Sequence, residues 1–121
     1  MKIQTRRAVA LIALCLIADQ QPGPLFDHQE GAYFPFSGKV TKEEIDVYDL
    51  TDQCSIQGKM VQEGNFSLFH NGNHAVIDLI VTLEEFSGFD YNSNKRFEGT
   101  GFDKTVSLFD YEGAKYQNFS L

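Results

Sequence analysis

The chain has 121 residues, a length that suits one domain with a modest core. Hydrophobic residues make up 42% of it and charged residues 22%, which is typical of a folded soluble domain and argues against disorder. The formal net charge of −7 disfavours nucleic acid and anionic membrane surfaces as partners, because both bind basic surfaces.

The first 18 residues form a segment of their own. Three basic residues precede an uninterrupted apolar run over residues 8–18, and polar residues and a Pro-Gly-Pro sequence follow. This order is typical of a secretory signal peptide, and the run is shorter than the about 20 residues of a membrane span. We therefore expect a signal-peptide-like helix over 1–18 and a single domain over 19–121 of a secreted or periplasmic protein. If residues 1–18 are retained as a helix, we expect a cytoplasmic protein.

Export would change the charge and the cysteine content. Cleavage after residue 18 would remove three of the ten basic residues and none of the seventeen acidic ones, so the net charge would become −10. Cys54 would then be the sole cysteine, and a lone thiol forms no internal disulfide. We expect the hydrophobic core, rather than a bridge between Cys15 and Cys54, to hold the fold.

Five related segments follow one another from residue 23 onwards. They begin at residues 23, 45, 66, 86 and 106, so the spacings are 22, 21, 20 and 20 residues. The fourth position of each segment is aromatic: Phe26, Tyr48, Phe69, Phe89 and Phe109. The fifth position is acidic except in the third segment: Asp27, Asp49, His70, Asp90 and Asp110. Regular spacing of this kind indicates a repeat of one supersecondary unit.

Each segment has the pattern of a β-hairpin. In the last one, Val106, Leu108 and Asp110 fall on one face of a strand and the residues between them on the other. Turn residues follow the aromatic–acidic pair, including the Asn-Gly at 71–72, which is a strong hairpin signal. We expect the Asp at the fifth position to cap its own turn, with its carboxylate accepting backbone N–H bonds.

About ten short strands in a row would leave exposed edges unless the sheet closes. The sequence therefore predicts an all-β antiparallel meander of five β-hairpin repeats, folded into a closed or nearly closed barrel. Five glycines are expected where this small sheet must bend: Gly38, Gly58, Gly88, Gly99 and Gly101. Two packed sheets, or a stacked solenoid, are the alternative architectures.

The five fourth-position aromatics are the candidate partner-binding residues: Phe26, Tyr48, Phe69, Phe89 and Phe109. If they face outward, they form a contact surface for a protein or a glycan. If they face inward, they belong to the core, which is the ordinary place for such side chains.

A metal site is a further hypothesis. His70 and His74 flank the turn of the third repeat, and Asp78 lies further along the second strand, so the three could hold zinc or another transition metal. Two solvent-facing histidines at a hairpin tip are the alternative. The acidic series could also bind a divalent cation if the turns meet at one rim, although no turn has the spacing of a calcium loop.

No catalytic pattern is evident. The chain has no nucleophile elbow, no glycine-rich phosphate loop and no local signature around Cys54. We therefore expect no enzymatic activity and no cofactor, and an exported, non-catalytic binding module for an unknown protein or glycan. The alternatives are a carrier of a small apolar ligand with an internal barrel cavity, and a metal-dependent protein that uses His70 and His74.

Overall fold

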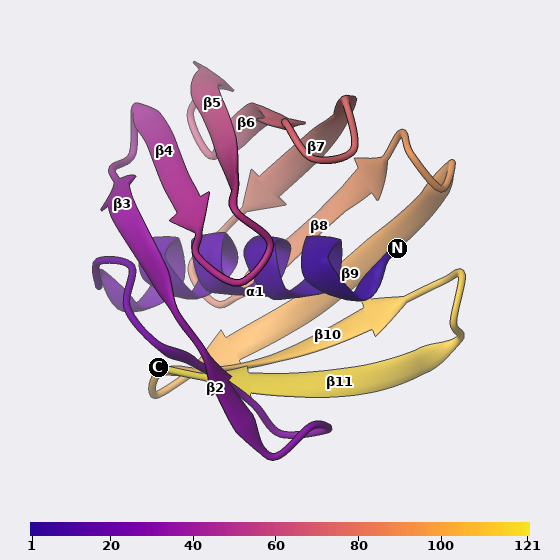
Figure 1. Ribbon diagram of the computed structural model, residues 1–121. Helices are drawn as coiled ribbons and strands as arrows, with labels where there is room; N and C mark the ends of the chain where they lie inside the picture. The colour runs from indigo at the N-terminus through magenta and orange to yellow at the C-terminus, as the bar shows by residue number, and fades with distance from the viewer.

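A computed structural model describes residues 1–121. One helix, α1 (Ile3–Ala18), is surrounded by a single antiparallel sheet of eleven strands (Figure 1). The strands are β1 (Leu25–Asp27), β2 (Ala32–Phe34), β3 (Phe36–Val40), β4 (Glu44–Asp49), β5 (Cys54–Gln62), β6 (Asn65–His70), β7 (Ala75–Val81), β8 (Glu85–Asp90), β9 (Lys95–Phe102), β10 (Thr105–Asp110) and β11 (Lys115–Ser120). The sheet is a nearly closed barrel, which confirms the predicted hairpin meander.

The five repeats correspond to five hairpins: β1–β2, β4–β5, β6–β7, β8–β9 and β10–β11. The eleventh strand is β3, which follows β2 after Pro35 and pairs with β4. Strand β1 pairs with both β2 and β11, so the first repeat is joined to the last. Strands β2 and β3 are the two edges of the sheet, and the barrel is interrupted between them.

The side chain of Gln21 covers part of the free edge of β3. Its Nε2 donates a hydrogen bond to the carbonyl oxygen of Val40 at 2.9 Å, and its Oε1 accepts one from the Val40 N–H at 3.1 Å. The side-chain amide of Gln21 thus makes the two hydrogen bonds to Val40 that a neighbouring strand would otherwise make. An edge covered in this way is less able to pair with another chain.

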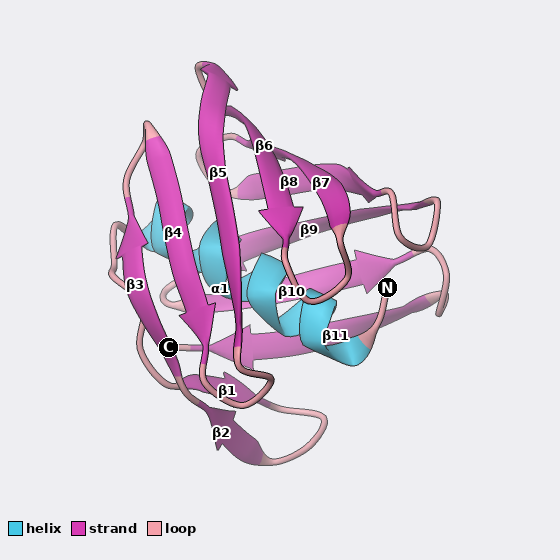
Figure 2. Cartoon of the chain, turned by 45° about the horizontal axis from the view of Figure 1, so that its top comes forward, coloured by secondary structure: helices cyan, strands magenta, loops and turns pink.

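Helix α1 lies inside the barrel (Figure 2). Ala8–Leu14 are at most 1% exposed, and from Ala8 onwards the helix is apolar on all sides, as a buried helix must be. Inward-facing strand residues complete the same core: Leu25, Val47, Ile56, Leu68, Ile77, Leu79, Phe97, Leu108 and Phe119. The core of the domain is therefore a helix wrapped by a sheet.

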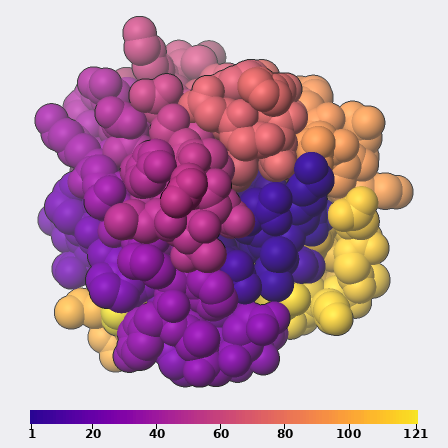
Figure 3. Space-filling view, in the orientation of Figure 1, coloured from indigo at the N-terminus to yellow at the C-terminus, as the bar shows by residue number.

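The signal-like segment is thus part of the core of this fold. Ten of the sixteen residues of α1 are buried, and a chain cut after residue 18 would lose all of them. In Figure 3 the indigo atoms of the N-terminal residues reach the surface between atoms of the surrounding strands. No helix in this structure is sufficiently long and apolar to span a membrane.

Two glycines allow large side chains to lie across neighbouring strands. Gly88 of β8 is paired with Phe97 of β9, and Phe86 of β8 is paired with Gly99 of β9. A Cβ atom at Gly88 would overlap the backbone oxygen of Asp78 and the Phe97 ring. These glycines therefore occupy points of close approach within the curved sheet.

Candidate functional site

The fifth-position residues of all five repeats lie at one rim of the barrel, around the N-terminal end of α1. Each ends the inward face of a strand, as Asp110 does after Val106 and Leu108. All five are at most 2% exposed: Asp27, Asp49, His70, Asp90 and Asp110. The turns therefore meet at one rim, which was the condition for the hypothesis of a divalent-cation site, and the side chains point into the barrel.

The four aspartates cap their own turns, as predicted, and His70 does so as well. Asp49 Oδ1 accepts hydrogen bonds from the backbone N–H groups of Thr51 and Asp52, at 3.0 and 3.1 Å. The Oδ1 atoms of the other three aspartates do the same with N–H groups in their own turns. His70 takes this role through Nδ1, which accepts from the Asn73 N–H at 3.2 Å. Turn capping therefore explains the repeated polar residue.

The ninth position of every repeat has a left-handed backbone conformation. The φ angles are 65° for Gly31, 53° for Gln53, 51° for His74, 58° for Asn94 and 55° for Ala114. This position ends the turn before the second strand of each hairpin begins. His74 is accordingly the turn residue of its repeat.

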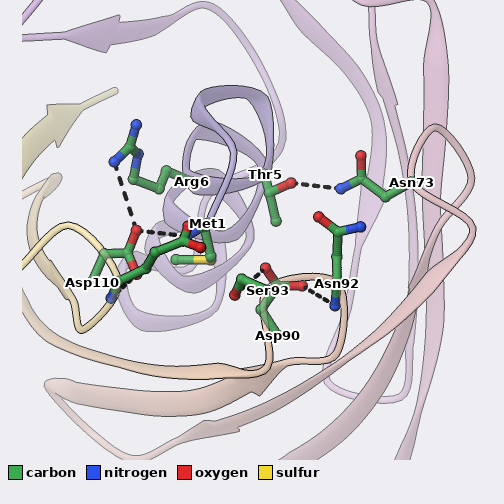
Figure 4. A network of polar contacts seen from close by, with 9 residues as sticks. Met1, Thr5, Arg6, Asn73, Asp90, Asn92, Ser93 and Asp110 are labelled. Atoms are coloured by element: carbon green, nitrogen blue, oxygen red, sulfur yellow. Dashed lines mark hydrogen bonds and ion pairs between the residues drawn. The ribbon is translucent and has the colours of Figure 1, made fainter.

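Two of the aspartates also bind the helix through their second oxygen. Arg7 Nε donates to Asp27 Oδ2 at 3.1 Å. Figure 4 shows the second aspartate, Asp110, whose Oδ2 lies 2.8 Å from the Met1 amino group and 3.6 Å from Arg6 Nη1. The N-terminal end of a helix carries a partial positive charge, so carboxylates are favoured there. The basic residues that resemble the start of a signal peptide thus have partners inside the fold.

Burial shifts the pKa of Asp49, His70 and Cys54 at this rim. It raises the pKa of Asp49, against the hydrogen bonds from Thr51 and Asp52, and it lowers the pKa of His70. It also raises the pKa of the Cys54 thiol, and the nearby charge of Asp49 raises it further. The thiol therefore stays protonated at neutral pH, which makes it a weak nucleophile.

The structure brings Cys54 and His70 together, a proximity that the sequence did not predict. Both flank Gly72, because a Cβ atom there would lie 3.1 Å from Cys54 Sγ and 3.1 Å from His70 Cε1. His70 Nε2 is buried and has no hydrogen-bond partner. Cys54 could not be placed near a histidine from the sequence because no motif links the two residues.

The structure does not bring the predicted metal-binding residues together. His70 is buried on the inward face, whereas His74 is exposed, and Asp78 lies on the outward face and accepts a hydrogen bond from the Tyr91 hydroxyl at 2.9 Å. His70 and Asp78 are thus on opposite sides of the sheet. No three His, Cys, Asp or Glu side chains are arranged to hold a metal ion, and this includes the acidic series.

The five fourth-position aromatics face outward, one residue before the inward-facing rim residues. We call them the aromatic belt: Phe26, Tyr48, Phe69, Phe89 and Phe109. Tyr48 is 41% exposed and Phe69 is 38% exposed, and the other three are half-buried. Of the two interpretations that the sequence left open, the structure supports the outward one.

Neighbouring aromatic rings hold the belt in place. Phe26, Phe89 and Phe109 pack edge-on against the residues two positions later, with ring centroids 4.8–4.9 Å apart. Those partners are His28, Tyr91 and Tyr111. Sequence reasoning missed them, although the Phe-Asp-Tyr sequence at both 89–91 and 109–111 was a usable signal.

The two tyrosines also bind acidic side chains on adjacent strands. Tyr91 donates its hydroxyl hydrogen to Asp78, and Tyr111 donates to Glu98 at 2.6 Å. These hydrogen bonds raise the pKa of both tyrosines. Each ring is therefore held in one orientation on the surface.

No protein-family model, curated protein or solved structure matches the chain. The class of the protein is therefore described by its fold alone: a nearly closed antiparallel barrel of eleven strands around a central helix. The outward aromatic belt and the inward polar rim are the two regular features from which a function can be inferred.

Proposed function

We propose that the protein is a non-catalytic binding module that contacts a protein or a glycan through its aromatic belt. The observation that carries this proposal is that all five belt residues face outward, at the same position in each repeat. The core of 24 buried residues includes none of them. Because the core contains none of these aromatic side chains, they are available to contact a partner.

The geometry of the belt favours binding. Aromatic rings supply a large contact area, and rings that are already fixed lose little conformational entropy when a partner binds. The carboxylates of Asp78 and Glu98 lie beside two of the rings and can accept hydrogen bonds from a partner. Apolar ring faces next to polar acceptors suit both protein and sugar surfaces.

The chemistry of the polar rim supports a non-catalytic role. Its aspartates are used to cap turns, and two of them are also paired with the helix. The Cys54 thiol beside His70 has a raised pKa, whereas an activated thiol has a lowered one. These groups stabilise the fold and are poorly suited to acid–base or nucleophilic chemistry.

The test compares two double variants. In the belt variant, Phe89→Ser/Phe109→Ser, two half-buried rings on strands β8 and β10 are removed from the surface. In the matched control, Ser87→Ala/Ser107→Ala, two outward residues of the same strands are changed. Glycan-array binding and photo-crosslinking in a host extract are then measured, with circular dichroism as the check on folding.

We expect a glycan or a protein that binds the wild type and the control but not the belt variant. Equal binding by all three proteins, or no partner in either assay, would contradict the proposal. Binding to the array alone would assign a glycan, and crosslinking alone would assign a protein.

A carrier of small apolar ligands is the second candidate, and it requires an empty barrel. Helix α1 occupies the space in which such a ligand would lie, so the carrier function applies to a chain from which the helix has been removed. We propose instead that the helix is retained, because Arg7 is paired with Asp27 inside the barrel.

The intact mass of the protein from its own host tests whether the helix is retained. A mass of 13.7 kDa is expected, and loss of residues 1–18 would support export and the carrier function.

A further inference from the structure

The opposite rim of the barrel, at the C-terminal end of α1, contains a pocket of about 340 Å³. Its floor is made by Leu14, Ile17 and Ala18 of the helix. Its walls are the β7–β8 turn, with Leu83 and Glu84, and the β9–β10 turn, over residues 101–106. Because β10 runs from this rim to Asp110, the pocket is separated from the aromatic belt by the length of the strand.

Large apolar side chains around the pocket are exposed to solvent. Leu83 is 90% exposed and Phe102 is 78% exposed, and these are the two most exposed large apolar residues of the chain. Val61, on the neighbouring β5–β6 hairpin, is 65% exposed, and the Val81 N–H donates to the Gly64 carbonyl to hold the two hairpins together. A small molecule in the pocket would leave these side chains in water, so the surface fits a macromolecular partner.

The turn at the edge of the pocket is conformationally strained. Asp103 and Lys104 both have left-handed backbones, with φ angles of 49° and 64°. Two-residue hairpin turns with this geometry ordinarily carry Asn-Gly or Asp-Gly. The Leu121 N–H donates to the Lys104 carbonyl at 2.9 Å and holds the turn in place. Strain of this kind often accompanies a functional surface, and here it places two charged side chains beside Phe102.

The charge around the pocket is predominantly negative. Glu84 and Asp103 line the pocket together with one basic residue, Lys104. The other exposed charged residues on the turns of this rim are Asp19, Glu43 and Glu63, which are acidic, and Lys42, which is basic. The C-terminal end of α1 adds a partial negative charge. A partner that covers these apolar side chains would therefore bind better if positive charges surrounded its own apolar residue.

We propose that this tip surface, formed by Val61, Leu83, Phe102 and the pocket at the end of α1, docks a short basic segment of a partner protein, with an apolar side chain of that segment in the pocket. The inference is independent of the aromatic belt, because the two surfaces share no residue. Either can fail in an experiment without affecting the other.

The test is selection of random heptapeptides, displayed on phage, on the full chain. Selected peptides are then measured against three variants: a tip variant, Leu83→Ser/Phe102→Ser; a charge variant, Glu84→Gln/Asp103→Asn; and the belt variant, Phe89→Ser/Phe109→Ser, as the matched control. Leu83 and Phe102 are so exposed that their replacement should leave the fold intact, and urea unfolding checks this.

We expect the selected peptides to combine net positive charge with a large apolar residue. Binding should fall at least about tenfold on the tip variant, fall to a smaller extent on the charge variant, and stay unchanged on the belt variant. Enrichment of neutral or acidic peptides, no enrichment at all, or equal binding by the tip variant would overturn the proposal. Loss of binding on the belt variant alone would assign the peptides to the belt and would overturn it as well.

Discussion

Arg7, on the central helix, donates from Nε to Oδ2 of Asp27, on the first strand, at 3.1 Å, and both side chains are at most 9% exposed. The Arg7 guanidinium carbon also lies 3.4 Å from the centroid of the Phe34 ring. Asp27 uses its other oxygen to cap the β1–β2 turn. One carboxylate thus joins the helix to the hairpin that lies beside the interruption in the barrel.

Asp27→Ala should lower the free energy of unfolding by about 3 kcal/mol, because it removes the turn cap and leaves the charge of Arg7 buried without its partner. Asp52→Ala, at an exposed position, is the control, and we expect it to change stability by no more than about 0.5 kcal/mol. Urea unfolding measures both. A double variant, Asp27→Ala/Arg7→Met, should lose less than the sum of its single variants, and simple additivity would show that the pair is not coupled.

Acid should destabilise the fold through His70. Burial lowers the pKa of this imidazole from 6.5, and Nδ1 caps the turn in the neutral form. As the pH falls below 6.5, the unfolded state takes up a proton that the folded state does not bind, so the stability that this group contributes is lost as the pH passes down through the folded pKa. The free energy of unfolding should be compared at about pH 7.5 and about pH 5.5.

The control for this prediction is His70→Asn, which retains an acceptor for the Asn73 N–H and has no titratable group. The variant should lose less stability than the wild type over the same pH interval. A decrease of equal size in both proteins would assign the acid sensitivity to other groups.

Gly88→Ala should destabilise the barrel by about 1–3 kcal/mol, because the added Cβ would overlap the backbone oxygen of Asp78 and the ring of Phe97. Gly23→Ala is the matched control, since a Cβ at Gly23 would meet nothing within 4 Å. The melting temperature of Gly23→Ala should stay at or above that of the wild type. A Gly88→Ala protein as stable as this control would mean that the sheet can open locally at β8.

Ala114→Gly should stabilise the protein by about 1 kcal/mol, because Ala114 has a φ of 55° and glycine adopts this conformation without steric cost. The same substitution at Ala75, on strand β7, should lower stability by about 0.5–1 kcal/mol. Thermal unfolding of the two variants gives the comparison. A melting temperature that drops in Ala114→Gly would show that the turn gains nothing from glycine.

A chain of residues 19–121 should not unfold cooperatively, because nine of the 24 core residues would be missing. Circular dichroism and a urea titration test this, and a synthetic peptide of residues 1–18 added in trans should restore the transition. A shortened chain with a sharp transition of its own would show that the barrel stands without its helix, as cleavage during export would require.

The repeat and its alternation were sufficient to predict the hairpins and which residues share one face of a strand. Val106, Leu108 and Asp110 lie on one face as expected, because a strand has a period of two whatever surrounds it, and the structure shows that this face is the inward one. Whether Phe109 would face the core or water was not predictable, since this depends on what fills the interior. The helix fills it, and no local pattern distinguishes an apolar segment bound for the core from one bound for export.

Two further features depended on long-range contacts. Strand β3 is separated from β2 only by Pro35, and it counts as a strand because β4 lies beside it. Cys54 approaches His70 because the register of β4, β5 and β6 brings them to the same end of neighbouring strands. Spacing along the chain carries no information on either contact.

The pairing of β1 with β11 determines when the domain can become stable during synthesis. Helix α1 and β1 leave the ribosome first, whereas the strand that pairs with β1 is made after nearly all the others. Throughout that interval the apolar helix has no complete wall around it, and the outer strands of the growing sheet have free edges. Contacts between such distant parts of a chain form slowly. A nascent chain of this design therefore exposes apolar surface until its last strand has been made, and partly folded chains with exposed apolar surface are prone to aggregate.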